Sequence, residues 1–365
     1  MASRRDGEGP EVAVSVCIVT GRRSRLLARC LESLAAQRDA PAWELRVLAD
    51  GDPDVEAVVR EHVPGAVVGR VQKALPGAAR NFLIAEARGE LLLFLDDDVV
   101  VKNDLLRRLV DLAGAHPEIA VFGGPNETPP WDSDFQRVQG AVLASIAGSG
   151  PVRRRYGVHP PGPADERFFT LCNLAIRRAA MLPFANDIVC AEENELLDRL
   201  ARAGNPMRYD ASLVVYHERR DTLRGFTAQM RKYGRGRGQL IARRPGTAQV
   251  AYLAPAALVV YLAVAVPAAL LLAEPIALGP GVLYVLWVLA GGWKVGRTFG
   301  RRRVWPIASS LMVLLHVNYG IGVLWGFVER RRAVPASPRD SGVNNLAMPK
   351  QLTPERRRGE AGGGK

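Results

Sequence analysis

Cysteine is scarce in this chain, and its four cysteines do not form the closely spaced pairs that are typical of zinc sites. They are Cys17, Cys30, Cys172 and Cys190. Two of them fall inside apolar segments, and their scattered positions do not indicate a disulfide framework. The sequence therefore argues against a cysteine-rich extracellular scaffold, and we expect reduced, structural thiols in a cytosolic domain.

A hydrophobic leader is also missing. Residues 1–11 are charged and rich in glycine and proline, and the first apolar run is only as long as one strand. We therefore expect a disordered N-terminus over residues 1–11, no secretory signal peptide, and an N-terminal half that stays in the cytosol. Residues 333–365 are rich in proline, glycine and arginine, which predicts a disordered tail.

Charged residues are absent from three long apolar runs, at residues 250–273, 275–292 and 304–328. Each run is close to the roughly 20 residues that a helix needs to cross a bilayer. Buried soluble helices are the alternative, but three such runs together argue against it. Residues 245–332 are therefore expected to form a transmembrane region of two to three segments.

Basic residues at the ends of these runs predict the orientation. Arg243 and Arg244 precede the first run, and Lys294 and Arg297 follow the second, so both flanks are expected on the cytoplasmic side. A third full span would place the arginines at 330–332 outside, against the same rule. The last run also contains polar residues and glycines, namely His316, Asn318, Gly320 and Gly322. It is therefore re-entrant, split or a third span, in a multi-pass protein of the cell (inner) membrane whose N-terminal domain is cytoplasmic.

The net charge of +12 fits either nucleic acid or an anionic membrane surface. The position of the positive charge in the sequence decides between them, because many arginines lie in residues 219–244, just before the first apolar run. A basic belt beside a hydrophobic segment is typical of contact with membrane lipids. We therefore expect membrane lipids as partners and no nucleic acid.

Strand-like and helix-like segments alternate over residues 12–244. Strands are expected at residues 12–20, 43–49 and 91–95, and helices at residues 26–37 and 76–88. This order predicts an α/β domain with a mostly parallel sheet and helices on both faces. Ligands of such sheets bind beyond the carboxyl ends of the strands, where Thr20, Asp50 and Asp96 to Asp98 are expected.

Three consecutive aspartates end the third of these strands. Side chains alternate along an extended chain, so Asp96 and Asp98 share a face and Asp97 points away from it. Paired carboxylates suit Mg2+ or Mn2+, which in turn bind a diphosphate. The alternative is an acidic turn that caps the helix after Asp104.

Several motifs in this order resemble the inverting glycosyltransferases of family 2, which have the GT-A nucleotide-sugar-binding fold. The motifs are VSVCIVTGR, VLADGDPD, PGAARN, FLDDDV, LCNLAIRR and AEENELLDRLARAG. The resemblance implies a nucleotide-diphosphate sugar as donor and Mg2+ or Mn2+ on Asp96 and Asp98. It also implies a set of donor and acceptor contacts: Thr20, Asp50, Arg80 and Asp97 for the donor, and Asn173 by the acceptor cleft.

The last of these motifs supplies the expected general base. The family uses the aspartate of an ED pair, which aligns here with Glu193, so the side chain is one methylene longer. Glu192 remains an alternative base, and Asp187 is the next candidate. Acids at the start of a helix are also common without any catalytic role.

Two later segments extend the resemblance. His217, in VVYHERR, resembles a histidine that many GT-A enzymes use as a further metal or diphosphate contact. QMRKY resembles the QxxRW signature of membrane polysaccharide synthases and places Gln229, Lys232 and Tyr233 in the acceptor and diphosphate region. YGRGRG and HVNYGIG resemble the membrane-anchored exopolysaccharide transferases of the succinoglycan type.

Together these features predict an enzyme that moves one sugar from a nucleotide-diphosphate sugar to a lipid-linked or glycan acceptor at the cytosolic membrane face, in cell-surface polysaccharide synthesis. A processive polysaccharide synthase is the main alternative, and the departure from QxxRW argues against it. A metal-dependent nucleotidyltransferase would not explain the AEENELL helix. A non-catalytic membrane scaffold would not need carboxylates at several strand ends.

Overall fold

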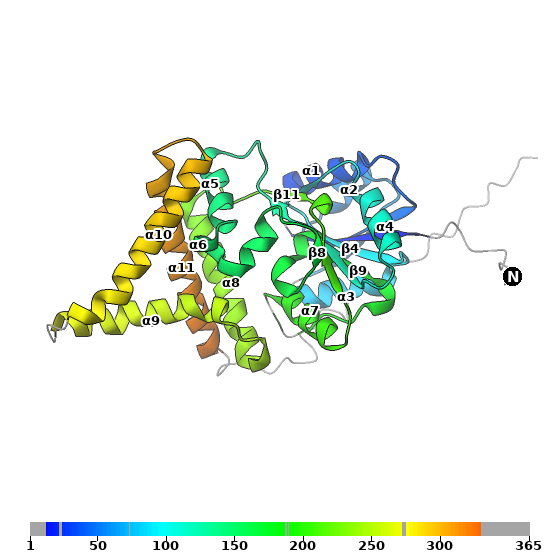
Figure 1. Ribbon diagram of the computed structural model, residues 1–365. Coiled ribbons are helices and arrows are strands. Elements are labelled where there is room, and N and C mark those ends of the chain that lie inside the picture. Colours follow the sequence, from blue (N-terminus) through cyan, green and yellow to red (C-terminus); the bar gives the residue numbers. More distant parts are fainter. Residues whose placement is uncertain are drawn as a thin grey trace, which may run out of the picture.

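The computed structural model describes residues 12–21, 24–72, 74–186, 188, 190–271 and 275–329 (Figure 1). The predictions for the two chain ends and for Asp187 lie outside these residues.

The central sheet has eight strands and is mostly parallel, as predicted. Its order is β3 (Val67–Val71), β2 (Trp43–Asp50), β1 (Val14–Gly21), β4 (Leu91–Asp96), β9 (Leu174–Arg177), β6 (Val121–Gly123), β10 (Met207–Tyr209) and β8 (Gly162–Pro163). The first four are parallel to one another, and β9 is antiparallel to both of its neighbours. The pairing of Gly21 with Asp50 and of Val19 with Asp96 brings these strand ends to one edge.

Helices cover both faces of this sheet. Helices α1 (Ser24–Ala35), α2 (Val55–His62) and α4 (Leu105–Ala115) pack with Val16 and Ile18 of β1 in one apolar cluster. Helices α3 (Pro76–Glu86) and α7 (Glu192–Arg202) pack with Cys17 in another. The alternation along β1 therefore sends successive side chains into two separate cores.

A second, smaller sheet positions the histidine of the site. Its order is β5 (Val99–Val101), β11 (Val215–His217) and β7 (Asn126–Glu127). The antiparallel pairing of β11 with β5 sets His217 opposite Val99. Because Val99 directly follows Asp98, this register brings His217 beside the aspartate triplet.

Six further helices form the other side of the molecule. They are α5 (Asp134–Leu143), α6 (Ile146–Ser149), α8 (Leu223–Arg243), α9 (Val250–Leu271), α10 (Gly279–Thr298) and α11 (Val304–Glu329). Figure 1 shows α8 between the sheet domain and the last three helices. The last three are long and apolar enough to cross a membrane. The final run, for which a break was one of the alternatives, is one continuous helix.

Helix α11 packs closely along α8. A Cβ atom at Gly234 of α8 would lie 2.0 Å from the carbonyl oxygen of Tyr319, and one at Gly322 would lie 2.2 Å from that of Arg231. The two backbones therefore touch at positions where only glycine fits. Arg231 also donates a hydrogen bond to Asn318 at 2.7 Å. The YGRGRG and HVNYGIG motifs thus form one helix–helix contact.

Two arginines of α8 contact other parts of the protein, and one of them is buried rather than part of the predicted belt beside membrane lipids. Arg235 forms an ion pair with Glu329 at 2.6 Å, and Arg237 is buried and donates a hydrogen bond to Asn194 at 2.8 Å. Arg235 remains exposed beside α11, whereas Arg237 projects toward the start of α7.

The four cysteines are free, and three of them are buried. Burial raises the pKa of the Cys17 and Cys172 thiols to about 12, so both stay protonated at neutral pH. Cys17, Cys30 and Cys172 lie in the apolar cores as free thiols, and Cys190 lines the cavity described below.

Candidate active site

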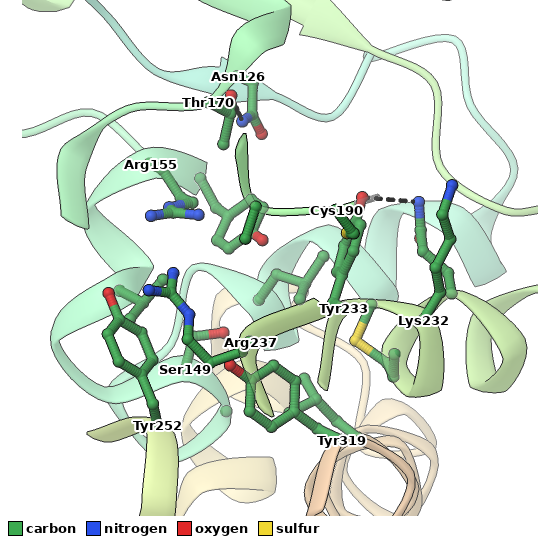
Figure 2. Close-up of a pocket in the computed structure, with 18 of the residues that line it drawn as sticks. Asn126, Ser149, Arg155, Thr170, Cys190, Lys232, Tyr233, Arg237, Tyr252 and Tyr319 are labelled. Atoms are coloured by element: carbon green, nitrogen blue, oxygen red, sulfur yellow. Dashed lines mark hydrogen bonds between the residues drawn. The ribbon is translucent and has the colours of Figure 1, made fainter. Parts of the chain in front are cut away.

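A cavity of about 910 Å3 lies between the strand ends and the C-terminal helices. One end is lined by the aspartate triplet and by the first residues of α7. The other end is lined mostly by apolar side chains of α9, α10 and α11. Figure 2 shows part of the wall between these ends, with Lys232, Tyr233 and Arg237 of α8. Most predicted site residues meet in this cavity, although they are far apart in the sequence.

Asp96, Asp98 and His217 form a group that can hold a metal ion. One ligand atom from each lies within 4.8 Å of the other two. His217 Nε2 is 3.1 Å from Asp98 Oδ1. Two carboxylates and an imidazole are suitable ligands for a divalent cation such as Mn2+. The β5–β11 pairing brings His217, which the family resemblance offered as a further metal contact, beside Asp98.

Asp97 has a different partner from Asp98; β4 ends at Asp96, so the turn that follows, and not the predicted alternation along a strand, sets its direction. It is buried and accepts a hydrogen bond of 2.6 Å from the hydroxyl of Thr20 at the end of β1. Asp104 does not cap α4 with its side chain and instead binds Arg108 at 2.6 Å. The triplet is therefore not part of an acidic helix cap. Thr20 and Asp50 are not among the described residues that line the cavity.

Arg219 holds the imidazole of His217 in place. This arginine is buried, and its Nη1 lies 3.3 Å from His217 Nδ1. It also donates to the carbonyl and side-chain oxygens of Asn126, at 2.6 and 3.0 Å. The sequence placed Arg219 in a basic belt beside the membrane, and only the packing of β7 against β11 reveals this different role.

Arg80 of α3 connects the metal-ligating group to α7. Its Nη1 donates to Glu192 Oε1 at 2.7 Å, and its Nη2 lies 4.0 Å from Asp96 Oδ1. Burial raises the pKa of Glu192 to about 7, although Arg80 lowers it, and the adjacent charge of Glu193 adds to the rise. Arg80 is thus positioned to offset negative charge beside Asp96.

Glu193 differs from Glu192 in its contacts. It lines the cavity and is half-buried, and it has no ion-pair partner among the described residues. Ala191, just before the helix, adopts a left-handed conformation with φ of +69°. Such a conformation is uncommon outside glycine and costs about 1 kcal/mol. This turn directs the start of α7 into the cavity.

The acceptor-region predictions divide between the cavity and the protein interior. Gln229, Lys232 and Tyr233 line the cavity, and the hydroxyl of Tyr233 lies 3.0 Å from the side-chain amide of Gln229. Asn173 is buried and donates a hydrogen bond of 2.5 Å to the carbonyl oxygen of Leu213. It is not among the described residues that line the cavity.

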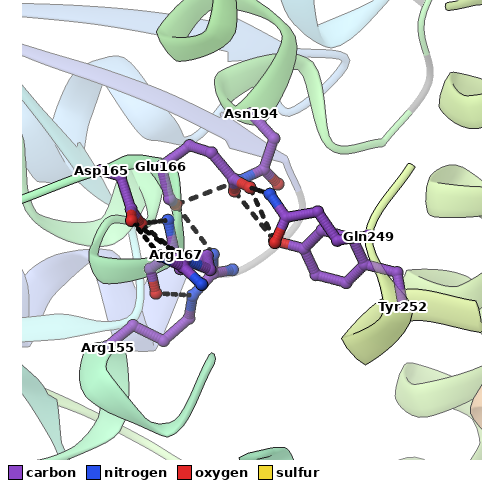
Figure 3. A network of polar contacts seen from close by, with 7 residues as sticks. All are labelled: Arg155, Asp165, Glu166, Arg167, Asn194, Gln249 and Tyr252. Atoms are coloured by element: carbon purple, nitrogen blue, oxygen red, sulfur yellow. Dashed lines mark hydrogen bonds and ion pairs between the residues drawn. The ribbon is translucent and has the colours of Figure 1, made fainter. Parts of the chain in front are cut away.

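Glu166 joins the start of α7 to the start of α9, and sequence reasoning missed it (Figure 3). Its carboxylate accepts hydrogen bonds from Asn194 at 3.0 Å, Gln249 at 2.8 Å and Tyr252 at 2.9 Å. Arg155 donates to the carbonyl oxygen of Glu166 at 3.0 Å. No motif in the sequence indicates this network, because its members come from separate loops and helices.

The sequence matches the family model for glycosyl transferase family 2 over residues 15–177. Residues 15–177 are therefore similar to the glycosyltransferases of family 2. The GT-A type fold of the chain and its assignment as a glycosyltransferase, both predicted from the sequence, are confirmed. The matched region contains the aspartate triplet and ends at Arg177, before α7 and the apolar helices.

A curated relative covers more of this glycosyltransferase. The succinoglycan biosynthesis protein ExoM of Rhizobium meliloti (strain 1021) is 25% identical over 255 residues, which are 63% of this chain and 76% of that protein. The resemblance to succinoglycan-type proteins that the sequence suggested is therefore confirmed.

Comparison with solved structures shows a similar fold at low sequence identity for a mannosyltransferase. The mannosyltransferase PcManGT from Pyrobaculum calidifontis, in complex with GDP-Man and Mn2+, is 17% identical, with a TM-score of 0.54 over 87% of this chain and 91% of that one. S. aureus TarS 1-349 is 15% identical, with a TM-score of 0.45 over 88% of this chain and 92% of that one.

Proposed function

We propose that this glycosyltransferase moves a single sugar, with inversion, from a nucleotide-diphosphate sugar to a lipid-linked or glycan acceptor. The observation that carries the proposal is one cavity that contains both the Asp96, Asp98 and His217 group and the carboxylate of Glu193. The names of the relatives support it, because one is a mannosyltransferase in complex with GDP-Man and Mn2+ and another a succinoglycan biosynthesis protein. Because one of these relatives is a succinoglycan biosynthesis protein, the proposed role is in cell-surface polysaccharide synthesis.

Asp96, Asp98 and His217 would hold the divalent cation, Mg2+ or Mn2+. Their separation of less than 4.8 Å and their ligand types fit such an ion. When bound, the cation supplies positive charge that offsets the negative charge of the departing nucleotide diphosphate. Arg80 adds a second positive charge on the same side of the cavity, next to Asp96.

Glu193 is the proposed general base. In an inverting transfer the acceptor oxygen forms a bond to the anomeric carbon while the bond from that carbon to the diphosphate breaks, and the acceptor proton passes to a carboxylate. The carboxylate of Glu192 is already bound to Arg80, at 2.7 Å. Glu193 lines the same cavity without such a partner among the described residues, so it is the better placed of the two to accept a proton.

A screen of nucleotide sugars tests this function. The full-length protein in neutral detergent should hydrolyse one or a few nucleotide sugars slowly in the presence of Mn2+ or Mg2+, and EDTA should stop the reaction. Failure to bind or turn over any nucleotide sugar with either ion would reject the proposal.

We also propose that the protein is a multi-pass protein of the inner membrane with a cytoplasmic catalytic domain. Helices α9 and α10 support this, because only 11% of their most apolar windows is buried within the protein. Labelling of intact cells with an impermeant maleimide tests the orientation. Cysteine at the exposed Ile276, between α9 and α10, should react, and cysteine at Arg235 should not; the reverse pattern would refute it.

A further inference from the structure

Two buried arginines line the cavity on the side away from the metal-ligating group. Arg155, in the 3-10 helix η1 (Gly150–Tyr156), is 7% exposed, and Arg237 of α8 is 5% exposed. Figure 2 shows their guanidinium groups on the same side of the cavity. Neither role was predicted from the sequence, which placed Arg237 in the basic belt beside the membrane.

The described partners of these two arginines in hydrogen bonds and ring contacts are neutral. Arg155 donates to the carbonyl oxygens of Glu166 and Arg167, at 3.0 and 3.3 Å. Arg237 donates to the side-chain oxygen of Asn194 at 2.8 Å and lies over the ring of Tyr252, at 3.7 Å from its centroid. Neither arginine forms an ion pair with any residue that the structure describes.

Other charged groups lie close enough to act on them. Burial lowers the pKa of Arg155 and Arg237, but neighbouring tyrosines and the carboxylates of Glu166 and Glu193 raise it overall. The carboxylate of Glu166 is already occupied by three neutral donors, from Asn194, Gln249 and Tyr252. Among the described residues no carboxylate contacts either guanidinium group, so an anionic ligand would supply the first direct ion pair.

Helix α7 separates this pair from Arg80. Glu192 and Asn194 are two residues apart, which is about 200° around a helix, so their side chains leave opposite sides. Glu192 binds Arg80 on the side of Asp96, and Asn194 binds Arg237 on the other. The arginine pair therefore lies on the side of the general base opposite to the expected donor diphosphate.

The part of the cavity that α9, α10 and α11 line is mixed, with apolar side chains beside Tyr284 and His316, which are hydrogen-bonded to each other at 3.0 Å. Its lining there includes Leu258 of α9, Trp287 of α10 and Leu315 of α11. A ligand whose anionic group lay between the arginines would therefore extend an apolar portion among these helices. Its other portion would extend toward Glu193.

We propose that Arg155 and Arg237 form an oxyanion subsite that binds a phosphate group of the acceptor, between an apolar chain and the sugar that receives the new bond. The planar, forked guanidinium groups suit phosphate oxygens. This subsite deepens the proposed function and rests on it, because it assumes that the cavity receives an acceptor. The phosphate is part of a lipid acceptor or of a soluble one, and the probes below distinguish them.

Equilibrium binding to the full-length protein in neutral detergent tests the subsite without donor or metal. The probes are dodecyl phosphate, inorganic phosphate, glucuronic acid and the neutral dodecyl glucoside. Dodecyl phosphate should bind most tightly, and Arg155→Gln and Arg237→Gln should each weaken it by about tenfold or more. Arg154→Gln is the matched control, because Arg154 is exposed on the same 3-10 helix and does not line the cavity.

The relative affinities of the probes distinguish a lipid-linked phosphate from a soluble one. Inorganic phosphate binding as tightly as dodecyl phosphate, with the same dependence on both arginines, would support a phosphate subsite but refute the lipid chain. If glucuronic acid bound as tightly as dodecyl phosphate and depended on both arginines, the subsite would bind an acidic sugar, and the phosphate proposal would be refuted. Three results would overturn the subsite. They are no binding of dodecyl phosphate, the same dodecyl phosphate affinity in both variants as in the wild type, and equally tight binding of dodecyl glucoside.

Two further measurements exclude misfolding of the variants and binding of the probe at the donor site as explanations. Arg155→Lys and Arg237→Lys keep the charge but lose the fork, so they should weaken dodecyl phosphate several-fold, and unchanged affinity would count against the proposal. Nucleotide-sugar hydrolysis is measured on the same variants. If the wild-type protein hydrolyses no nucleotide sugar but binds dodecyl phosphate through both arginines, the proposed function fails and the anion subsite stands.

Discussion

The two ends of the cavity are built from different kinds of structure. The end at the strand termini consists of charged groups, such as Asp98, Glu192 and Arg80, whose positions follow from strand register and from the start of α7. The opposite end consists mostly of apolar side chains on α9, α10 and α11, whose positions follow from helix packing. Changes at the first end should therefore affect chemistry, and changes in the helix contact should affect stability.

The largest effect is expected from Asp98→Asn at the charged end. It removes a charge from the metal-ligating group while keeping the size of the side chain, so metal-dependent donor turnover should fall by about a hundredfold to a thousandfold. Hydrolysis of the nucleotide sugar and circular dichroism are measured together. Asp104→Asn is the control, because Asp104 binds Arg108 at the start of α4 outside the cavity. Full turnover in Asp98→Asn would show that the group does not hold a required metal.

The next effect separates the two acids of α7. Glu193→Gln should lower sugar transfer by about a hundredfold, because the general base is lost, and donor affinity should change little. Glu192→Gln should cost only about tenfold, through the altered position of Arg80. Should Glu192→Gln be the inactive variant and Glu193→Gln near normal, the base is Glu192. If both variants remain active, the base lies elsewhere, and Asp187 is the next carboxylate to substitute.

At the helical end, substitution of one glycine reverses the usual effect of helix propensity. Alanine normally stabilises a helix relative to glycine by about 1 kcal/mol. At Gly322 a Cβ atom would lie 2.2 Å from a carbonyl oxygen of α8, so Gly322→Ala should instead destabilise the protein by about 1–3 kcal/mol. Gly114→Ala, which lies inside α4 and has open space for the added Cβ, is the control. The melting temperatures of the two variants in detergent should shift in opposite directions relative to the wild type. Equal shifts would contradict the close packing of α8 and α11.

The smallest effect is a dependence of stability on pH. Burial raises the folded-state pKa of Glu192 to about 7, from an unfolded value near 4.5. Because the folded state binds this proton more tightly, the resulting stabilisation is complete below the unfolded pKa and is lost as the pH rises through about 7. The melting temperature of the wild type should therefore fall relative to that of Glu192→Gln between pH 5 and pH 8. Parallel profiles would show that the pKa of Glu192 is not raised.

The sequence predicted most of the charged end. Continuous apolar runs located β1 and β4, and the aspartate triplet located their common edge, because strand ends in a parallel sheet meet at one side. It could not assign Arg219 to the site, since the hydrogen bonds from Arg219 to Asn126 depend on the pairing of β11 with β7. It also could not separate Glu192 from Glu193, because the difference lies in the ion pair with Arg80.

The helical end was predicted in composition but not in environment. Helices α9 and α11 have mean hydropathies of 2.1 and 1.7, yet 11% of the most apolar window of α9 is buried and 44% of that of α11. Hydropathy does not distinguish lipid from protein as the neighbour. The glycines and Asn318 of α11 indicate a protein neighbour, because small residues permit close helix contact and a polar residue needs a partner. Sequence reasoning treated them as interruptions of a membrane span.

The most direct test of metal-dependent sugar transfer at the charged end is a titration with Mn2+, followed by electron paramagnetic resonance, in the presence of a nucleoside diphosphate. The wild-type protein should bind one Mn2+ per chain, and Asp98→Asn should lose this binding while Asp104→Asn keeps it. A bound Mn2+ that is unaffected by Asp98→Asn, or no bound Mn2+ in the wild type, would contradict a metal-dependent site at Asp96, Asp98 and His217.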